Sequence, residues 1–265
     1  VYGENIIDNI SQLADYTPDL NFVEIVLFHT PELHNIPTAG EIETIYEIGN
    51  LTNTSYTVHL PSSLEIGSEN QETRENSVRL LIDIWSRTIG LEPEFYILHI
   101  PITRPTLVPV PGEYFYSESS HPWDEWTSRA MDSLKHIRRC VGKEPVLLLE
   151  NINYSPKFLK PFLEAGCGKF CLDVGHLMLG GEDVLEVLDS FWDDIQEIHL
   201  HGVMGYSEHL SIDVLPRRRV AEFLSRLYRE EYGGAVNLEV FTPQDLQSSL
   251  DMLLSIMTEL TIESW

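Results

Sequence analysis

Residues 170–176 read FCLDVGH, a short apolar run that ends in an aspartate and, three residues later, a histidine. Such a run is typical of a buried strand, and a carboxylate at its end needs a partner because burying an unpaired charge is costly. An apolar run that ends in a histidine or a carboxylate recurs in YTVHLP (56–61), YILHIP (96–101), LLLENIN (147–153), EIHLHGV (197–203) and VNLEVF (236–241). The chain therefore repeats one unit, an apolar strand that ends in a potential ligand.

Strand-like runs alternate with helical periodicity along the whole chain. The predicted strands are Phe22–Phe28, Ser55–Leu60, Phe95–Ile100, Pro145–Glu150, Lys169–Asp173, Gln196–His201 and Val236–Phe241. One of the helical patterns is Val78, Leu81, Ile82 and Trp85, spaced along one helix face. This alternation predicts an α/β fold with a parallel sheet. A length of 265 residues suits one TIM barrel, (β/α)8, as a single domain over residues 1–265.

A closed barrel of this kind has eight strands, and the sequence shows seven. The helix predicted at Asn5–Tyr16 has no strand before it. We expect the first strand to lie upstream of Val1, with an incomplete barrel as the alternative.

The composition limits the partners and the compartment. Asp and Glu number 42 against 17 Lys and Arg, a formal net charge of −25. A surface this acidic repels a polyanion, so we expect a small-molecule substrate and no nucleic acid. No apolar run approaches the roughly 20 residues that span a bilayer, which predicts no membrane segment. The first residues lack a basic signal-peptide region, and three cysteines make no disulfide framework, so we expect a cytoplasmic protein.

Six successive strand ends carry His, Asp or Glu. In parallel α/β barrels the carboxyl ends of the strands meet at one mouth, so these residues would converge. Mixed histidine and carboxylate ligands suit Zn²⁺ or Mn²⁺ better than Ca²⁺ or Mg²⁺. The predicted metal ligands are His59, His99, Glu150, Asp173, His176, His199, His209 and Glu239. A single such histidine is more often a hydrogen-bonded structural residue, but the ordered set favours a metal centre.

The ordered set resembles the xylose-isomerase-like barrel superfamily of sugar isomerases, epimerases and AP endonucleases. In the isomerases and epimerases one metal is held by residues that match Glu150, Asp173, His199 and Glu239. The AP-endonuclease branch adds two histidines at the positions of His59 and His99, which join the shared glutamate at a second metal. A third site there matches His176 and His209, but its aspartate falls on Ser207, which puts a third metal in doubt.

The stretches YTVHLPSSLEIGS, ENINYS, CLDVGHLMLGG and IHLHGV, followed by EHLS, look like the cobamide-remodelling phosphodiesterase (CbiR) family of the same superfamily. Those enzymes hydrolyse the phosphoribosyl bond in the nucleotide loop of cobalamin-type corrinoids, releasing a cobinamide phosphate and a ribazole. The resemblance therefore implies a metal-dependent hydrolase with a corrinoid substrate.

The expected mechanism uses two ions roughly 3.5–4 Å apart, one activating water and one stabilising the leaving oxygen. The candidate catalytic residues are Glu150, Glu239, His176 and His201. We expect Glu150 to bridge the ions, and His176 to bind metal or to orient a phosphate oxygen. His201 would lie behind the ligands, turned the same way as His199. Which residue acts as the base stays open.

Five further residues are candidates for contact with the substrate: Glu24, Tyr114, Tyr116, Tyr206 and Arg217. Tyr114 and Tyr116 lie in the irregular stretch Pro101–Pro122, which we expect to cover the barrel mouth, although it could pack on the barrel surface instead. The alternative for Glu24 is a structural role, and the alternative for Arg217, which its place in a basic cluster favours, is the start of a solvated helix.

Three other functions compete with the hydrolase. A sugar isomerase or epimerase would need one metal and two carboxylates, for which Glu150 and Glu239 could serve. A DNA-repair endonuclease would need a basic groove, which the net charge opposes. A metal-free binding protein would leave buried like charges without neutralisation.

Overall fold

The computed structural model describes residues 5–13, 20–102, 123–142 and 144–263, within two compact units, Val1–Phe170 and Cys171–Trp265. We call these the amino-terminal and the carboxy-terminal unit. Tyr114 and Tyr116 lie outside the described residues.

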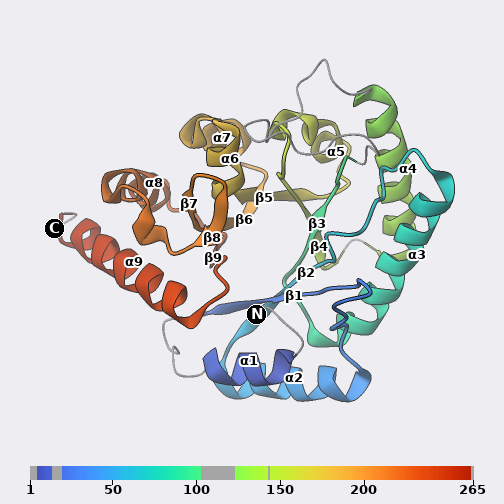
Figure 1. The fold of residues 1–265 in the computed structure, drawn as a ribbon, viewed down its shortest axis with the longest axis horizontal. Helices are drawn as coiled ribbons and strands as arrows, with labels where there is room; N and C mark the ends of the chain where they lie inside the picture. Colours follow the sequence, from blue (N-terminus) through green and yellow to red (C-terminus); the bar gives the residue numbers. More distant parts are fainter. Residues whose placement is uncertain (1–4, 14–19, 103–122, 143, 264–265) are drawn as a thin grey trace. The chain divides into compact units, whose positions relative to one another are not determined.

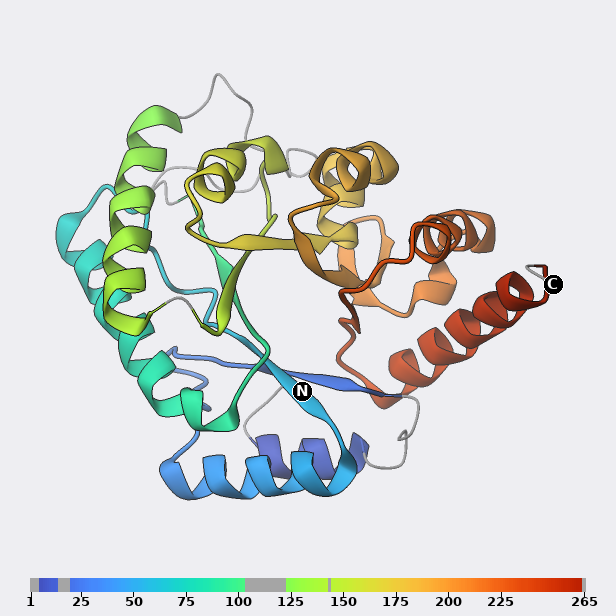
Figure 2. The same cartoon turned by 180° about the vertical axis from the view of Figure 1, so that it is seen from behind.

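The amino-terminal unit alternates strands and helices. Its elements are α1 (Ile6–Leu13), β1 (Phe22–Val26), α2 (Ala39–Thr52), β2 (Ser55–His59), α3 (Gln71–Thr88), η2 (Ile89–Leu91), β3 (Phe95–His99), α4 (Trp123–Val141), β4 (Val146–Glu150), η3 (Pro156–Phe158) and α5 (Lys160–Glu164). Strands β1 to β4 are parallel and follow one another in sequence order. Helices α3 and α4 lie side by side in Figure 1, as α1 and α2 do in Figure 2.

Capping and periodicity explain where these helices form. Thr38 and Glu41 make a reciprocal capping box that begins α2, and the Asn70 side chain caps α3. The buried faces of α3 and α4 carry Leu81 and Trp126, which are almost fully inaccessible to solvent. Apolar residues three and four positions apart therefore fix both helices against the strands.

Strand β5 (Lys169–Asp173) crosses the boundary between the units. The carboxy-terminal unit continues with α6 (Val174–Gly180), α7 (Val184–Phe191), β6 (Ile195–Leu200), β7 (Gly202–Met204), β8 (Ser207–Leu210), η4 (Ile212–Val214), α8 (Arg217–Arg229), β9 (Ala235–Leu238) and α9 (Pro243–Glu263). Strands β6 and β9 pair in parallel, whereas β7 and β8 form a short antiparallel hairpin. Helices α8 and α9 lie side by side (Figure 1).

The structure confirms the α/β fold class: the described strands and helices alternate as in a TIM barrel. All seven predicted strands form, each with ends within about three residues of the prediction. The hairpin β7–β8 is an addition to the seven predicted strands. No helix among the described residues is long and apolar enough to cross a bilayer. Cys171 is a buried free thiol.

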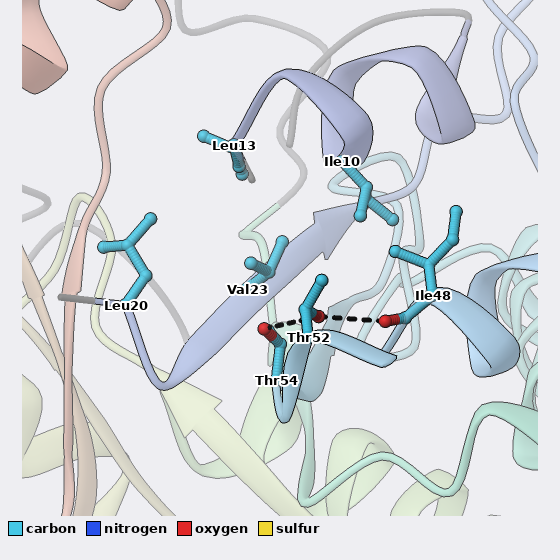
Figure 3. Close-up of a pocket in the computed structure, with 7 residues that line it drawn as sticks. All are labelled: Ile10, Leu13, Leu20, Val23, Ile48, Thr52 and Thr54. Atoms are coloured by element: carbon cyan, nitrogen blue, oxygen red, sulfur yellow. Dashed lines mark hydrogen bonds between the residues drawn. The ribbon is translucent and has the colours of Figure 1, made fainter. Parts of the chain in front are cut away.

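A small pocket lies where α1, α2 and the start of β1 meet (Figure 3). Its lining is Ile10, Leu13, Leu20, Val23, Ile48, Thr52 and Thr54. The Thr52 hydroxyl lies 2.9 Å from both the Ile48 carbonyl and the Thr54 hydroxyl, so these polar groups satisfy one another. With no titratable lining residue, this pocket belongs to the packing of the unit and offers no chemistry.

Candidate metal centre

Three predicted ligands end neighbouring strands of the amino-terminal unit. His59, His99 and Glu150 are the last residues of β2, β3 and β4. His99 lies opposite Glu150 in the β3–β4 register, and His59 lies opposite Ile97 in the β2–β3 register. Because the strands are parallel, all three side chains lie at the same edge of the sheet. We call them the histidine–glutamate site.

The two imidazoles of this site converge on one oxygen atom. His59 Nε2 and His99 Nε2 each lie 3.0 Å from Glu150 Oε2. The rings are perpendicular, with centroids 4.7 Å apart. The Glu150 side chain is 1% exposed, and the His59 and His99 side chains are 6% and 17% exposed. Nitrogen and oxygen atoms this close in a nearly dry site need a proton or a metal ion between them.

Hydrogen bonding identifies the lone pair that faces the carboxylate. His59 Nδ1 lies 2.8 Å from the Leu60 carbonyl oxygen, which can only accept, so Nδ1 carries the proton. In the neutral ring His59 Nε2 then offers a lone pair toward Glu150, an arrangement that repels unless a proton or a metal ion lies between them. A backbone carbonyl that fixes the tautomer is the usual support of a metal-binding histidine. The residues therefore fit a divalent metal.

The carboxy-terminal unit holds a second group of predicted ligands. Glu239 Oε2 lies 3.3 Å from His199 Nδ1, and Asp173 Oδ2 lies 4.0 Å from the same nitrogen. Asp173 and His199 are fully buried. Asp173 also begins α6, because its Oδ1 accepts a 2.6 Å hydrogen bond from the His176 backbone N–H. We call Asp173, His199 and Glu239 the carboxylate–histidine site. Sharing of Glu150 with this site stays a prediction.

Three further histidines form a cluster in the same unit. The ligand nitrogens of His176, His201 and His209 all lie within 4.8 Å of one another. Glu208 Oε2 lies 3.8 Å from His176 Nε2, and Glu208 Oε1 lies 3.9 Å from His209 Nε2. We call these histidines the three-histidine cluster. A carboxylate one residue after Ser207 therefore lies near two of these histidines.

The backbone at this cluster is strained. His209 has a φ of 56°, in the left-handed region that costs a non-glycine residue about 1–3 kcal/mol. The His209 backbone nitrogen lies 3.0 Å from His201 Nδ1, and His201 Nε2 lies 3.3 Å from Asp173 Oδ2. His201 therefore connects the hairpin to Asp173; its role behind the ligands stays a prediction.

Charge and burial shift the pKa values of His201 and His209 in opposite directions. Burial alone lowers the pKa of His201, but the Asp173 carboxylate outweighs it and raises that pKa to about 9. Burial, with the nearby charge of His201, lowers the pKa of His209 to about 4. His209 is therefore neutral at pH 7 and has a lone pair available for a metal.

Two residues that the sequence analysis did not single out shape these sites. A Cβ atom added at Gly175 would lie 1.9 Å from His201 Cε1, so only glycine leaves room for that ring. Glu197 is buried on β6, and its Oε1 lies 3.7 Å from His199 Nε2. It turns the opposite nitrogen of His199 toward Asp173 and Glu239. The available signals were the LDVGH motif for Gly175 and the two-residue spacing in EIH for Glu197.

The predicted substrate-binding residues lie on different elements. Glu24 is buried in the middle of β1, and Tyr206 is 60% exposed at the hairpin turn. Arg217 begins α8, where its guanidinium lies 2.6 Å from Glu259 and 3.1 Å from Ser255. A substrate phosphate would have to compete with Glu259. A role for these residues in binding stays a prediction.

No protein-family model and no curated protein matches this sequence. Solved structures do match it over nearly the full length. A structure described as a D-tagatose 3-epimerase-like protein has a TM-score of 0.79 and 19% identity, covering 99% of this chain and 97% of that one. Endonuclease IV from Thermus thermophilus has a TM-score of 0.70 and 17% identity, with 98% and 96% covered. A Thermus thermophilus protein soaked with ZnCl₂ has a TM-score of 0.66 and 21% identity, with 96% of each chain covered.

These likenesses identify the fold. The chain has a TIM-barrel fold similar to that of these structures. Sugar epimerases and an endonuclease share it, so the choice between reactions depends on the residues of the sites. The exclusion of nucleic acid therefore stays a prediction.

Proposed function

We propose that this chain is a metal-dependent phosphodiesterase that hydrolyses the nucleotide loop of a cobamide. The histidine–glutamate site is the observation that carries the proposal, since two histidine nitrogens meet one carboxylate oxygen at 3.0 Å each. An isomerase of this fold, as the resemblance implies, uses one ion, and neither histidine of this site is among its ligands. His59 and His99 would then have no ligand role, although they are built and oriented as ligands.

Each group of residues has a distinct task in this proposal. His59, His99 and Glu150 hold one divalent ion, and Asp173, His199 and Glu239 hold another; Zn²⁺ and Mn²⁺ fit these donors. When bound, such ions lower the pKa of water to about 7 and stabilise negative charge on phosphate oxygens. Leu60 and Glu197 fix the orientation of His59 and His199. His176 and His209 then orient a phosphate oxygen or, with Glu208, hold a further cation.

The corrinoid substrate rests on the family resemblance of the LDVGH, ENINYS and IHLHGV stretches. In the proposed reaction water adds across the bond between phosphate and ribose. Its hydroxyl joins the phosphorus, and its proton goes to the departing ribose oxygen. The products are a cobinamide phosphate and a ribazole, so no oxidant or other co-reactant is needed.

The test is an assay of the protein reconstituted with Zn²⁺ or Mn²⁺, using cobalamin and product detection by chromatography and mass. We expect both products from the native protein and none from the His59→Ala/His99→Ala double variant. Metal analysis should give at least two ions per native chain and one fewer in the double variant. Absence of product from protein with two bound ions would overturn the corrinoid substrate.

A sugar epimerase is the second candidate, because the carboxylate–histidine site alone provides two carboxylates around one histidine. The likeness to the D-tagatose 3-epimerase-like fold agrees with it. A single bound ion, together with conversion of a ketohexose that survives in the His59→Ala/His99→Ala variant, would favour the epimerase over the hydrolase.

A further inference from the structure

One buried indole touches the loops that follow two ligand-bearing strands. Trp126 lies on α4 and is 1% exposed. Its Nε1 donates a 3.4 Å hydrogen bond to the carbonyl of Pro101, two residues after His99. A Cβ atom added at Gly67, in the loop after β2, would lie 2.7 Å from the same Nε1 atom. The indole therefore rests directly on the backbone of that loop, which only glycine permits.

The loop after β2 is also fastened to two helices. Its backbone groups from residue 65 to residue 68 bond in turn to Ser77 (2.9 Å), Ser133 (2.8 Å), Arg129 (3.1 Å) and Arg74 (2.6 Å). Four consecutive residues are thus held by side chains of α3 and α4. A loop held this firmly gives Trp126 a fixed surface from which to position its neighbours.

A buried tyrosine connects the third loop. Tyr154 follows Glu150 by four residues and is fully buried. Its hydroxyl donates a 3.1 Å hydrogen bond to the Ile100 carbonyl, directly after His99. Its ring meets the Trp126 ring edge to face, with centroids 5.4 Å apart. The loops after β2, β3 and β4 therefore meet at one pair of aromatic side chains.

We propose that Trp126 and Tyr154, the aromatic clamp, are positioning residues of the histidine–glutamate site. They act through the main chain that follows His59, His99 and Glu150. Ligand atoms must be held within about 0.5 Å of productive geometry, and His99 has two clamp bonds on the two residues that follow it. The clamp keeps His59 Nε2 and His99 Nε2 aimed at one oxygen of Glu150. This inference rests on the part of the proposed function that assigns a metal to this site.

The same unit contains a matched pair with no such connection. Trp85 on α3 stacks on Tyr96 of β3, with centroids 3.8 Å apart, and both side chains are almost fully buried. The Tyr96 hydroxyl bonds to the Thr88 hydroxyl over 2.8 Å. None of these contacts involves a loop after a ligand. A loss of metal affinity that arises only from weaker core packing should therefore be the same for the two pairs.

The experiment compares Tyr154→Phe with Tyr96→Phe and Trp126→Phe with Trp85→Phe. Each protein is titrated with Co²⁺ alone, and the visible spectrum of the histidine–glutamate site is obtained by subtracting that of the same protein carrying His99→Ala. The unfolding midpoint of each metal-free protein is measured in the presence of a chelator. We expect Tyr154→Phe to weaken Co²⁺ binding at this site about tenfold and to change its spectrum. Tyr96→Phe should bind within twofold of the native protein at a similar loss of midpoint.

Equal Co²⁺ affinities in Tyr154→Phe and Tyr96→Phe would overturn the clamp, whether both are native or both are reduced. If Trp126→Phe does not fold, the tyrosine pair decides alone. The readout is also independent of the reaction. A clamp effect without cobalamin cleavage would overturn only the corrinoid substrate, and cleavage with unchanged affinity in Tyr154→Phe would overturn only the clamp.

Discussion

The two units place similar ligands on different kinds of support. In the amino-terminal unit all three ligands of the histidine–glutamate site end strands, and buried aromatic side chains hold the loops beyond them. In the carboxy-terminal unit the ligands come from strand ends, from the first turn of α6 and from a hairpin. Their support is local: a helix cap, a left-handed residue and a glycine. Strand ends give a site through topology alone, whereas the second arrangement requires specific local conformations.

The comparison predicts its largest effect at Glu150, which is the single carboxylate of its site. Glu150→Ala should abolish binding at the histidine–glutamate site and lower kcat by more than about 100-fold, since even residues behind metal ligands contribute 10–100-fold. Metal analysis and the product assay measure both effects. Glu94→Gln, an exposed change in the segment before β3, is the control. Native metal content in Glu150→Ala would refute the site.

Gly175 tests the local support of the second unit. Gly175→Ala would bring a methyl group to 1.9 Å from the His201 ring, so the ring must move. Overpacking of this kind costs about 1–3 kcal/mol of unfolding free energy. Urea unfolding and metal analysis should show lower stability and weaker binding in the carboxy-terminal unit. Gly40→Ala, with open space around the new methyl group, should leave both unchanged or slightly improved. Equal behaviour of the two variants would contradict the role of Gly175.

Glu197 tests whether the second site also depends on a residue behind its ligand. Glu197→Gln removes the charge beside His199 Nε2 but keeps the shape of the side chain. We expect about tenfold weaker binding at the carboxylate–histidine site and no change at the histidine–glutamate site, measured by Co²⁺ titration. Its control is Glu94→Gln. A loss at both sites, or at neither, would contradict independent support of the two sites.

The smallest effect should occur at Glu208, whose side chain is 31% exposed. Glu208→Gln should weaken binding at the three-histidine cluster by only a few fold, because solvent screens an exposed carboxylate. Isothermal titration with Zn²⁺ can resolve this change, with Asp213→Asn as the control. If affinity stays native in Glu208→Gln, this carboxylate does not replace the one absent at Ser207.

The strand ends could be predicted because two simple rules coincide there. Apolar runs such as Phe95–Ile100 reveal a buried strand, and parallel pairing brings their last residues to one edge. These two rules alone predict that His59, His99 and Glu150 lie close together. The sequence also carries Asp173 and His176 on either side of a strand-to-helix junction, so their proximity follows from the motif itself.

The remainder depends on conformations that leave little trace in the sequence. Strand β7 has only three residues, and β8 carries Ser, Glu and His, so no apolar period marks the hairpin. The contact of Glu208 with His176 depends on that hairpin and on the left-handed backbone of His209. The sequence pattern identifies Trp126 only as one of the apolar residues along a helix face. Its contact with Gly67 arises only when segments distant in the sequence pack together.

Asp173 links the folding of a helix to the occupancy of a site. One of its oxygens receives the His176 N–H that begins α6, and the other faces His199 and His201. A cation that orders this carboxylate also stabilises the first turn of the helix. Coupling between two equilibria is reciprocal, so formation of the helix strengthens cation binding by the same free energy. Amide hydrogen exchange at His176 would then report binding from the backbone itself. In such an arrangement the stability of α6 depends on the concentration of the metal ion.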